Sequence, residues 1–244
     1  MPESLKARTR NLCNRLLHPA GLHLVRREQA FEMRDLLERS AQRGTNVSTW
    51  IDIGASDGSW SVLAKKSFPK AEFLLFEPLT ERRPALEKLK HENNFHIVPA
   101  AAGRATGEIS FAVDAGLDGS GVALPGAAAT RQVPVETIDD AVKRHQLPGP
   151  YGIKLDTHGY ELPVLEGATA TLAATSLLIV EAYNFQLTPD CLRFHELCAW
   201  METRGFRCCD LASPMRRPSD GLFWQMDLAF IPAQSPLLVS NRYD

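Results

Sequence analysis

The sequence is poor in cysteine, in long apolar runs and in net charge. Its five cysteines form no CxxC pair, so we expect small buried thiols and no disulfide framework or zinc site. No apolar run approaches the roughly 20 residues that a membrane-spanning helix needs. The basic N-terminal residues lack the apolar stretch of a secretory signal, which predicts a cytoplasmic protein. The net charge of −2 lacks the basic excess of proteins whose main partner is nucleic acid.

The remaining composition is that of a globular protein with a sizeable core. Hydrophobic residues make up 44% and charged residues 23% of the 244 positions, and no repeat or low-complexity tract interrupts them. We expect an N-terminal helical segment over residues 1–46, in which Leu36 and Leu37 share an apolar stripe and Gly44 ends the helix. One main domain should then cover residues 47–233, followed by a tail over 234–244. A homo-oligomer is compatible with this organisation.

Apolar runs alternate with helical patterns along the main domain, which predicts a parallel sheet with crossover helices. The expected strands of this sheet are Trp50–Ile53, Glu72–Phe76, His96–Pro99, Gly152–Asp156 and Leu177–Glu181. The expected helices are Trp60–Phe68, Arg82–His91, Ile138–His145, Pro163–Ala173 and Pro189–Arg204.

Two regions depart from this alternation. Strands are expected at Glu108–Asp114 and Arg131–Glu136 without a helix between them, and their long connection is either a functional lid or irregular. Near the end, Phe206–Leu211 and Gln225–Ile231 are separated only by turn residues, so they should pair antiparallel. A seven-stranded, mostly parallel α/β sheet with helices on both faces and an antiparallel C-terminal hairpin is the Rossmann-like layout of class I methyltransferases.

A glycine turn follows the first strand, and an acid ends the second. Asp52 closes the first strand, the turn runs from Gly54 through Ser56 to Gly58, and Glu77 follows Gly58 by 19 residues. This spacing is close to that at which α/β nucleotide-binding folds place an acid on a ribose. We therefore expect an adenosine-containing cofactor, with both ribose hydroxyls on Glu77.

The turn favours S-adenosylmethionine (SAM) over a dinucleotide. A dinucleotide fingerprint needs glycine where this chain has Ser56, because the pyrophosphate must approach the backbone there. SAM has no pyrophosphate, its carboxylate suits amides near a helix N-terminus, and Asp52 is placed to meet its ammonium group directly or through water. The adenine should lie against the small residues 99–102, Ala101 among them. An NAD-dependent reductase remains the alternative.

A second group of polar residues follows the strand that ends at Asp156. His158 and Glu161 come directly after it, and Glu181 ends the next strand. Because ligands bind beyond the carboxyl ends of strands in open α/β sheets, these side chains should share an edge with Asp52 and Glu77. Lys154 precedes this edge, and we expect it to pair with an acid on a helix.

At these motifs the chain resembles the FkbM-type SAM-dependent methyltransferases over roughly residues 48–232. The first family signature, D-[IV]-G-A-N-x-G, is matched from Asp52 to Gly58 with Ser56 in place of Asn. The second, K-[IL]-D-x-E-G-x-E-x-x-V-L-x-G-A, is matched from Lys154 to Ala168 with His158 in place of Glu. Residues 133–139 are similar to a third element, V-x-V-x-T-[LI]-D.

The resemblance implies SAM as cofactor and O-methylation of a hydroxyl on a sugar or other small-molecule acceptor. His158 has the ordinary pKa of a general base, and Asp156 either orients it or acts as the base. Metal ligands stay unassigned; a divalent cation on Asp156, Glu161 and Glu181 is the less favoured alternative. A non-catalytic SAM-binding protein is a third reading, because the His158 departure is compatible with lost chemistry.

Overall fold

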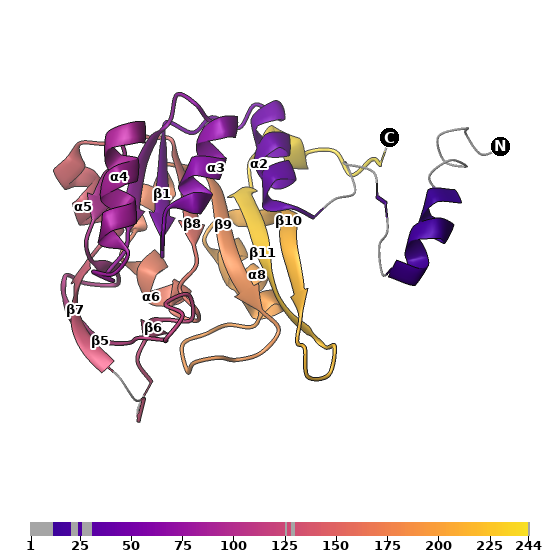
Figure 1. Cartoon of the computed structure of the whole chain (residues 1–244). Helices are drawn as coiled ribbons and strands as arrows, with labels where there is room; N and C mark the ends of the chain where they lie inside the picture. Colours follow the sequence, from indigo (N-terminus) through magenta and orange to yellow (C-terminus); the bar gives the residue numbers. More distant parts are fainter. Residues whose placement is uncertain (1–11, 21–23, 26–30, 125, 128–129, 244) are drawn as a thin grey trace.

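The computed structural model describes residues 12–20, 24–25, 31–124, 126–127 and 130–243, which form a layered α/β fold (Figure 1). Its helices are α2 (Met33–Gln42), α3 (Ser59–Ser67), α4 (Arg83–Asn93), α5 (Ile138–His145), α6 (Glu161–Glu166), α7 (Thr169–Ala173) and α8 (Phe194–Thr203). The strands of the main sheet are β1 (Thr49–Ile53), β2 (Glu72–Phe76), β3 (His96–Val98), β8 (Tyr151–Leu155), β9 (Thr175–Tyr183), β10 (Phe206–Arg216) and β11 (Phe223–Pro232). Residues 12–17 are also helical, and His18–Ala20 form a short 3₁₀ helix. The other residues of the helical segment expected over 1–46 are not helical or lie outside the described residues.

The main sheet has seven strands in the order β10-β11-β9-β8-β1-β2-β3. In this sheet β3, β2, β1, β8 and β9 run parallel to one another, while β11 is antiparallel to both of its neighbours, β9 and β10. This arrangement confirms the predicted class I methyltransferase fold, including the C-terminal hairpin. The hairpin strands are longer than predicted because β10 continues through bulges between Cys208 and Met215.

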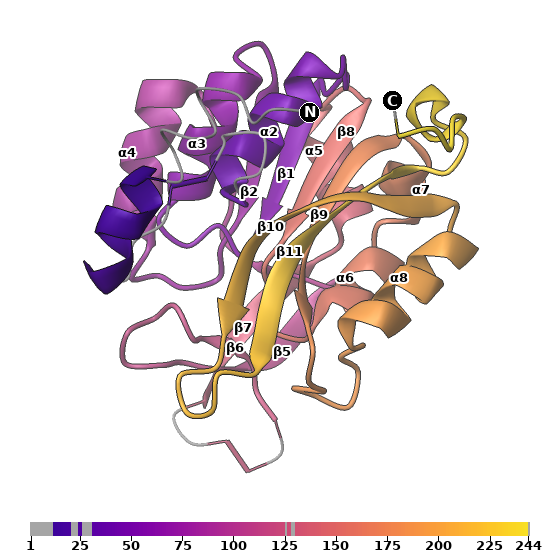
Figure 2. The same cartoon turned by 90° about the vertical axis from the view of Figure 1, so that its right-hand side faces the viewer.

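Helices cover both faces of the sheet, because successive strand residues point to opposite sides. Trp50 of β1 packs with Leu36 and Leu37 of α2 on one face, and Ile51 belongs to a second core with Val164 of α6 on the other. Figure 2 shows α2, α3 and α4 on the first face and α6, α7 and α8 on the opposite one. No helix among the described residues is long and apolar enough to cross a membrane.

A second sheet lies beyond the carboxyl end of β1 (Figure 1). Its strands are β4 (Ala101–Ala102), β5 (Gly107–Ala112), β6 (Gly121–Val122) and β7 (Thr130–Glu136), in the order β4-β7-β5-β6. The two expected strands therefore pair antiparallel as β5 and β7, and the segment between them contributes β6. This small sheet carries the loop of residues 113–120, which we call the β5–β6 loop.

Two helices differ from their predicted bounds. The helix expected over 163–173 is broken into α6 and α7, because Gly167 approaches the backbone so closely that a Cβ there would lie 2.0 Å from the carbonyl oxygen of Gly103. The helix expected from Pro189 begins at Phe194, where the Glu196 carboxylate accepts a hydrogen bond from the Arg193 amide at 3.0 Å. All five cysteines are free thiols, but only Cys191 is buried as expected; Cys208 is exposed, and the other three are partly buried.

Candidate active site

A cleft of about 380 Å³ opens where β1, β2 and β8 end. The ends of these strands are joined by backbone hydrogen bonds, from the Asp156 amide to the Ile53 carbonyl at 3.1 Å and from the Gly54 amide to the Phe76 carbonyl at 3.2 Å. The β5–β6 loop borders the cleft from the second sheet. The predicted site residues that line the cleft are Gly54, Ser56, Glu77, Ala101, Asp156 and His158.

The glycine turn brings β1 against the end of β8. Gly54 has a φ of 76°, and a Cβ at this position would lie 2.1 Å from the carbonyl oxygen of Asp156. Only glycine is compatible with both constraints. Ser56 also has a positive φ, 49°, in the region where asparagine is the more favourable residue. Its difference from the family signature therefore leaves the shape of the turn intact.

Glu77 lies at the end of β2 and faces the cleft. Its side chain is fixed by two backbone amides, because Oε2 accepts from Ser56 at 2.9 Å and Oε1 accepts from Leu79 at 2.8 Å. Burial raises the pKa of Glu77, and these two hydrogen bonds oppose the increase. Each oxygen keeps capacity for a further donor. The carboxylate is thus held in place and able to accept from a ligand.

Asp52 does not lie where the sequence predicted. Its side chain is 1% exposed, is absent from the cleft lining, and accepts a hydrogen bond from Ser61 of α3 at 2.6 Å. Burial raises its pKa to about 6, although Ser61 and Lys154 favour the charged form. Asp52 therefore joins β1 to α3 behind the turn, and direct contact with a ligand is not available to it in this structure.

One end of the cleft is apolar. Ala101 and Ala102 line it together with Phe111 and Val122 of the second sheet. Pro99 and Ala100, which the sequence placed beside the adenine, are not among the lining residues. Small side chains beside an aromatic ring leave space for a flat ligand ring.

The second motif brings Asp156, His158 and Glu181 together. His158 Nε2 lies 3.4 Å from Asp156 Oδ1 and 3.9 Å from Glu181 Oε2. Its other nitrogen, Nδ1, lies 3.2 Å from the carbonyl oxygen of Ser120 in the β5–β6 loop. Glu181 itself is buried behind His158, where its carboxylate accepts from the Tyr183 hydroxyl and the Gln225 amide.

These contacts favour a protonated His158. The contact with Asp156 and the charge of Glu181 raise the pKa of His158 to about 9, against the opposing effect of burial. Burial would raise the pKa of Asp156, but the Lys154 ammonium and His158 bring it below its usual range. Burial and the nearby Asp156 raise the pKa of Glu181 to about 8. Asp156 is therefore the ionised member of the three, and His158 and Glu181 both hold a proton at neutral pH.

Glu161 is not brought into this group. It is 6% exposed, and its Oε1 accepts from the Thr157 hydroxyl at 3.0 Å and the Gly159 amide at 2.9 Å. It stabilises the turn that presents His158, whose own φ is 53°. The structure thus places Glu161 in support of the turn and outside the cleft lining.

Lys154 pairs with acids on strands and not, as expected, with an acid on a helix. Its ammonium lies 3.1 Å from Asp156 Oδ2 and 3.7 Å from Asp227 Oδ1 of β11. Although burial disfavours the ammonium, the surrounding carboxylates raise the pKa of Lys154 above its usual value.

The three carboxylates considered from the sequence as ligands of a divalent cation, those of Asp156, Glu161 and Glu181, do not come together in the structure. Ligand atoms of Asp156, His158 and Glu181 lie within 4.8 Å of one another, whereas Glu161 points elsewhere. Lys154 already pairs with Asp156, and Tyr183 and Gln225 donate to both oxygens of Glu181. Protein donors thus already contact both carboxylates, and we assign no metal to this group.

Sequence reasoning missed Arg82 as a residue of the cleft. It lies just before α4, pairs with Asp118 of the β5–β6 loop, and keeps its Nε buried without a partner among the described residues. Asp118 also accepts from the Ser56 hydroxyl at 3.3 Å. No motif marks Arg82, because its role depends on a loop that is distant in sequence.

The fold and the cleft define a class I methyltransferase. The sequence matches the family described as the methyltransferase FkbM domain over residues 52–208, and the chain belongs to this family. This confirms the family resemblance, and the chain is a SAM-dependent methyltransferase. No curated protein matches the sequence.

Solved structures similar to this chain share little sequence with it. The Burkholderia thailandensis 1,6-didemethyltoxoflavin-N1-methyltransferase, solved with bound 1,6-didemethyltoxoflavin and S-adenosylhomocysteine, has 11% identity and a TM-score of 0.46, covering 95% of this chain and 92% of its own. TrmK of M. capricolum, in complex with S-adenosylhomocysteine, has 9% identity and a TM-score of 0.47, covering 81% and 67%. An uncharacterized protein from Listeria monocytogenes has 14% identity and a TM-score of 0.46, covering 84% and 70%.

Proposed function

We propose that this protein is an O-methyltransferase that transfers the methyl group of SAM to a hydroxyl of a small-molecule or glycosidic acceptor. The observation that carries the proposal is that one cleft is lined both by a fixed carboxylate beside a glycine turn, as a nucleoside would require, and by a polar pair suited to proton transfer. Glu77 and the glycine turn form the first, and Asp156 and His158 form the second. The turn at Gly54 is in backbone contact with the end of β8, so the two parts adjoin.

The cofactor end of the cleft fits SAM. Glu77 is held with free acceptor capacity for ribose hydroxyls, and Ala101 and Ala102 provide a flat apolar wall for adenine. Arg82 Nε, a buried donor without a partner among the described residues, suits a polar ligand atom. The amino-acid end of SAM would lie beside Gly54 and Ser56, with Asp52 supporting the turn from behind. The family assignment favours this cofactor over the NAD alternative.

The acceptor end is suited to deprotonating a hydroxyl. SAM supplies a methyl group made electrophilic by its sulfonium. When the acceptor oxygen bonds to that carbon, the carbon–sulfur electron pair would leave on sulfur, and the part of this chain would be that neutral His158 takes the hydroxyl proton at Nε2. Asp156 then stabilises the imidazolium, which it contacts at 3.4 Å. Such base catalysis is typically worth about 10²–10⁴-fold, and alignment of the two reactants about 7–11 kcal/mol.

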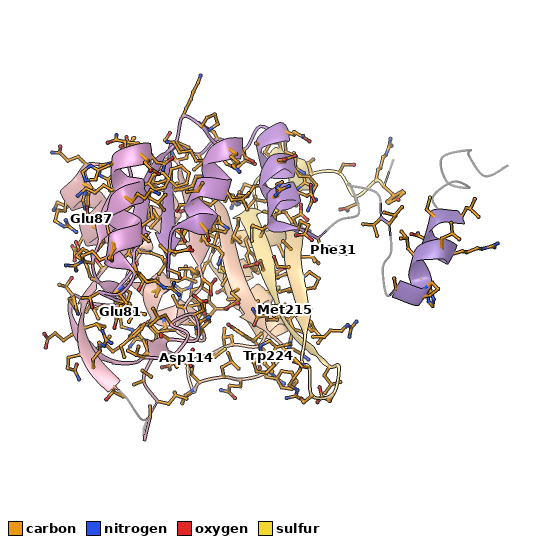
Figure 3. All side chains as sticks on the ribbon, viewed as in Figure 1. Phe31, Glu81, Glu87, Asp114, Met215 and Trp224 are labelled. Carbon is orange, nitrogen blue, oxygen red and sulfur yellow. The ribbon has the colours of Figure 1, made fainter. Side chains whose placement is uncertain are left out.

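The acceptor is proposed to be uncharged. The polar wall combines Asp156, His158 and the nearby Glu181, a set of donors and acceptors that matches hydroxyl groups. Phe185 and Trp224 lie with ring centroids 5.2 Å apart beyond Tyr183, and Figure 3 shows Trp224 at the same end of the molecule as Asp114 of the β5–β6 loop. Neither ring is among the residues that line the cleft, so the proposal assigns no acceptor contact to them.

Two measurements test the proposal. Isothermal titration should show binding of SAM and S-adenosylhomocysteine but not of NAD; the reverse pattern would refute it. Mass spectrometry of extracts from a deletion strain should reveal a hydroxylated metabolite or glycan lighter by one methylene, which the purified enzyme and SAM convert to the normal product. If the protein binds SAM while H158Q and D156N leave every methylated product unchanged, the non-catalytic reading replaces this one.

A further inference from the structure

Lys154 is a buried cation whose charge the proposed reaction does not use directly. It lies in the middle of the main sheet on β8, is 3% exposed, and does not line the cleft. It therefore cannot touch a substrate in this structure. Any effect that it has on the reaction must pass through a neighbouring group.

Carboxylates from every adjoining strand surround this lysine. Asp52 on β1, Glu181 on β9 and Asp227 on β11 face it, in addition to Asp156 at the end of β8 itself. The two carboxylates within 4 Å of its ammonium are those of Asp156, with Oδ2 at 3.1 Å, and of Asp227, with Oδ1 at 3.7 Å. Lys154 thus pairs with one carboxylate that lines the cleft, Asp156, and with one that does not, Asp227.

The same contacts form a chain that ends at the proton acceptor. Asp156 contacts Lys154 through Oδ2 and His158 through Oδ1. His158 is faced by Asp156 and Glu181 at Nε2 and by the Ser120 carbonyl at Nδ1. The positive charge of Lys154 reduces the negative potential at His158, and Asp227 reduces the effect of Lys154 in turn.

We propose that Lys154 is a positioning residue that, together with Asp227, sets how firmly Asp156 holds the proton on His158 and so the pH range of methyl transfer. This inference rests on the proposed function for its catalytic consequence. Its electrostatic half concerns only the protein and can be measured without a cofactor or an acceptor.

The proposal predicts that substitutions of Lys154 and Asp227 change the pH at which His158 releases its proton in opposite directions. In K154M, Asp156 attracts the imidazolium proton without competition, so His158 should release its proton at a pH about one unit higher than in the native protein. In D227N, Lys154 is less neutralised, so His158 should release its proton at a lower pH. The K154M/D227N double variant removes a cation and an anion together and should lie between K154M and the native protein.

The experiment is an NMR titration of the full-length protein labelled with ¹³C at histidine Cε1. The resonance of His158 is identified by its loss in H158Q, and K143M, which changes an exposed lysine of α5, is the matched control. K154M and D227N should move the His158 midpoint in opposite directions, and K143M should leave it unchanged. A common direction for both variants, or no movement in either, would overturn the proposal. If K154M does not fold, D227N and the double variant still decide the outcome.

Activity and cofactor binding then separate this inference from the proposed function. K154M should lower kcat at neutral pH, move the pH profile to higher pH, and leave the Kd of S-adenosylhomocysteine unchanged. A K154M variant that weakens S-adenosylhomocysteine binding without moving the NMR midpoint would assign Lys154 a purely structural role. Failure of the native protein to bind S-adenosylhomocysteine would refute the proposed function, whereas the NMR titration would still decide the electrostatic relationship.

Discussion

His158 Nδ1 lies 3.2 Å from the carbonyl oxygen of Ser120. A carbonyl only accepts hydrogen bonds, so this contact requires a proton on Nδ1 and leaves Nε2 as the nitrogen that titrates. Nε2 in turn faces Asp156 at 3.4 Å. The β5–β6 loop therefore fixes the tautomer of the residue that departs from the family signature, and orients its titrating nitrogen toward the polar end of the cleft.

The first prediction concerns the pH dependence of methyl transfer. The pKa of His158 is raised to about 9, first by its contact with Asp156, so the neutral base is scarce at pH 7. The value of kcat should rise with pH through about 9 and level off only above that pH. H158Q should lower kcat by about 10²–10⁴-fold and abolish this rise while leaving the KM for SAM unchanged. A native profile that is already flat at pH 7 would show that His158 is not the base.

The second prediction concerns Glu77. E77Q removes the charge of a carboxylate proposed to accept from the ribose, and hydrogen bonds to charged groups contribute about 1.5–3 kcal/mol. We expect S-adenosylhomocysteine to bind about 10–100-fold more weakly by isothermal titration. E81Q is the control, because Glu81 is half-exposed and pairs with Arg131 outside the cleft lining. Equal weakening in both variants would argue for a general effect on the loop after β2.

The position of a side chain could be predicted from the sequence where its own strand sets it, and could not where a distant segment sets it. Glu77 and Asp156 end parallel strands, and parallel strands end at one edge of the sheet, so their place in the cleft was predictable. Lys154 lies two residues before Asp156, on the same face of β8, yet its second partner, Asp227, comes from the antiparallel strand β11. Nothing in the sequence gives the register of that strand.

For two predicted site residues, the sequence gives the residue but not the direction of its side chain. Asp52 matches the family signature, but its side chain turns to Ser61 on the helix side of β1. Glu161 also matches, but its carboxylate is used by Thr157 and Gly159 within the turn. A motif fixes the identity of these residues, whereas the packing of α3 and the geometry of the turn decide where their carboxylates point.

The third prediction tests the close approach at the glycine turn. G54A would place a methyl group 2.1 Å from the Asp156 carbonyl at a φ of 76°, and strain in this region alone costs about 1–3 kcal/mol. We expect a lower free energy of unfolding in urea and loss of S-adenosylhomocysteine binding. G107A is the control, since no atom lies within 4 Å of its Cβ position and its φ is not in the left-handed region. Native stability in G54A would contradict this description of the turn.

The fourth prediction concerns metals. Lys154 already neutralises Asp156, and Tyr183 and Gln225 donate to Glu181, so we expect methyl transfer not to require a cation at this group. Activity after dialysis against EDTA should equal that of the untreated enzyme, and added Mg²⁺ or Mn²⁺ should change it less than twofold. Loss of activity that Mg²⁺ restores would instead establish a cation site on Asp156, His158 and Glu181.

The fifth prediction concerns the buried Asp52. Burial raises its pKa from 3.8 to about 6, so in the folded protein it binds a proton more tightly than in the unfolded chain. Its contribution to stability is therefore complete below pH 3.8 and is lost as the pH rises through about 6. D52N cannot ionise and still accepts a hydrogen bond from Ser61. Relative to the native protein, its free energy of unfolding should improve between pH 4.5 and pH 7.5, by about 2 kcal/mol.

Urea denaturation at the two pH values measures this difference, with D190N at an exposed loop position as the control. The same variants report on the cofactor. Because Asp52 lies behind the glycine turn and outside the cleft lining, D52N should change the Kd of S-adenosylhomocysteine less than E77Q does. If D52N weakens binding as strongly as E77Q, the Asp52 carboxylate must contact the ammonium group after all, as the sequence first indicated, and the Ser61 hydrogen bond must open when the cofactor binds.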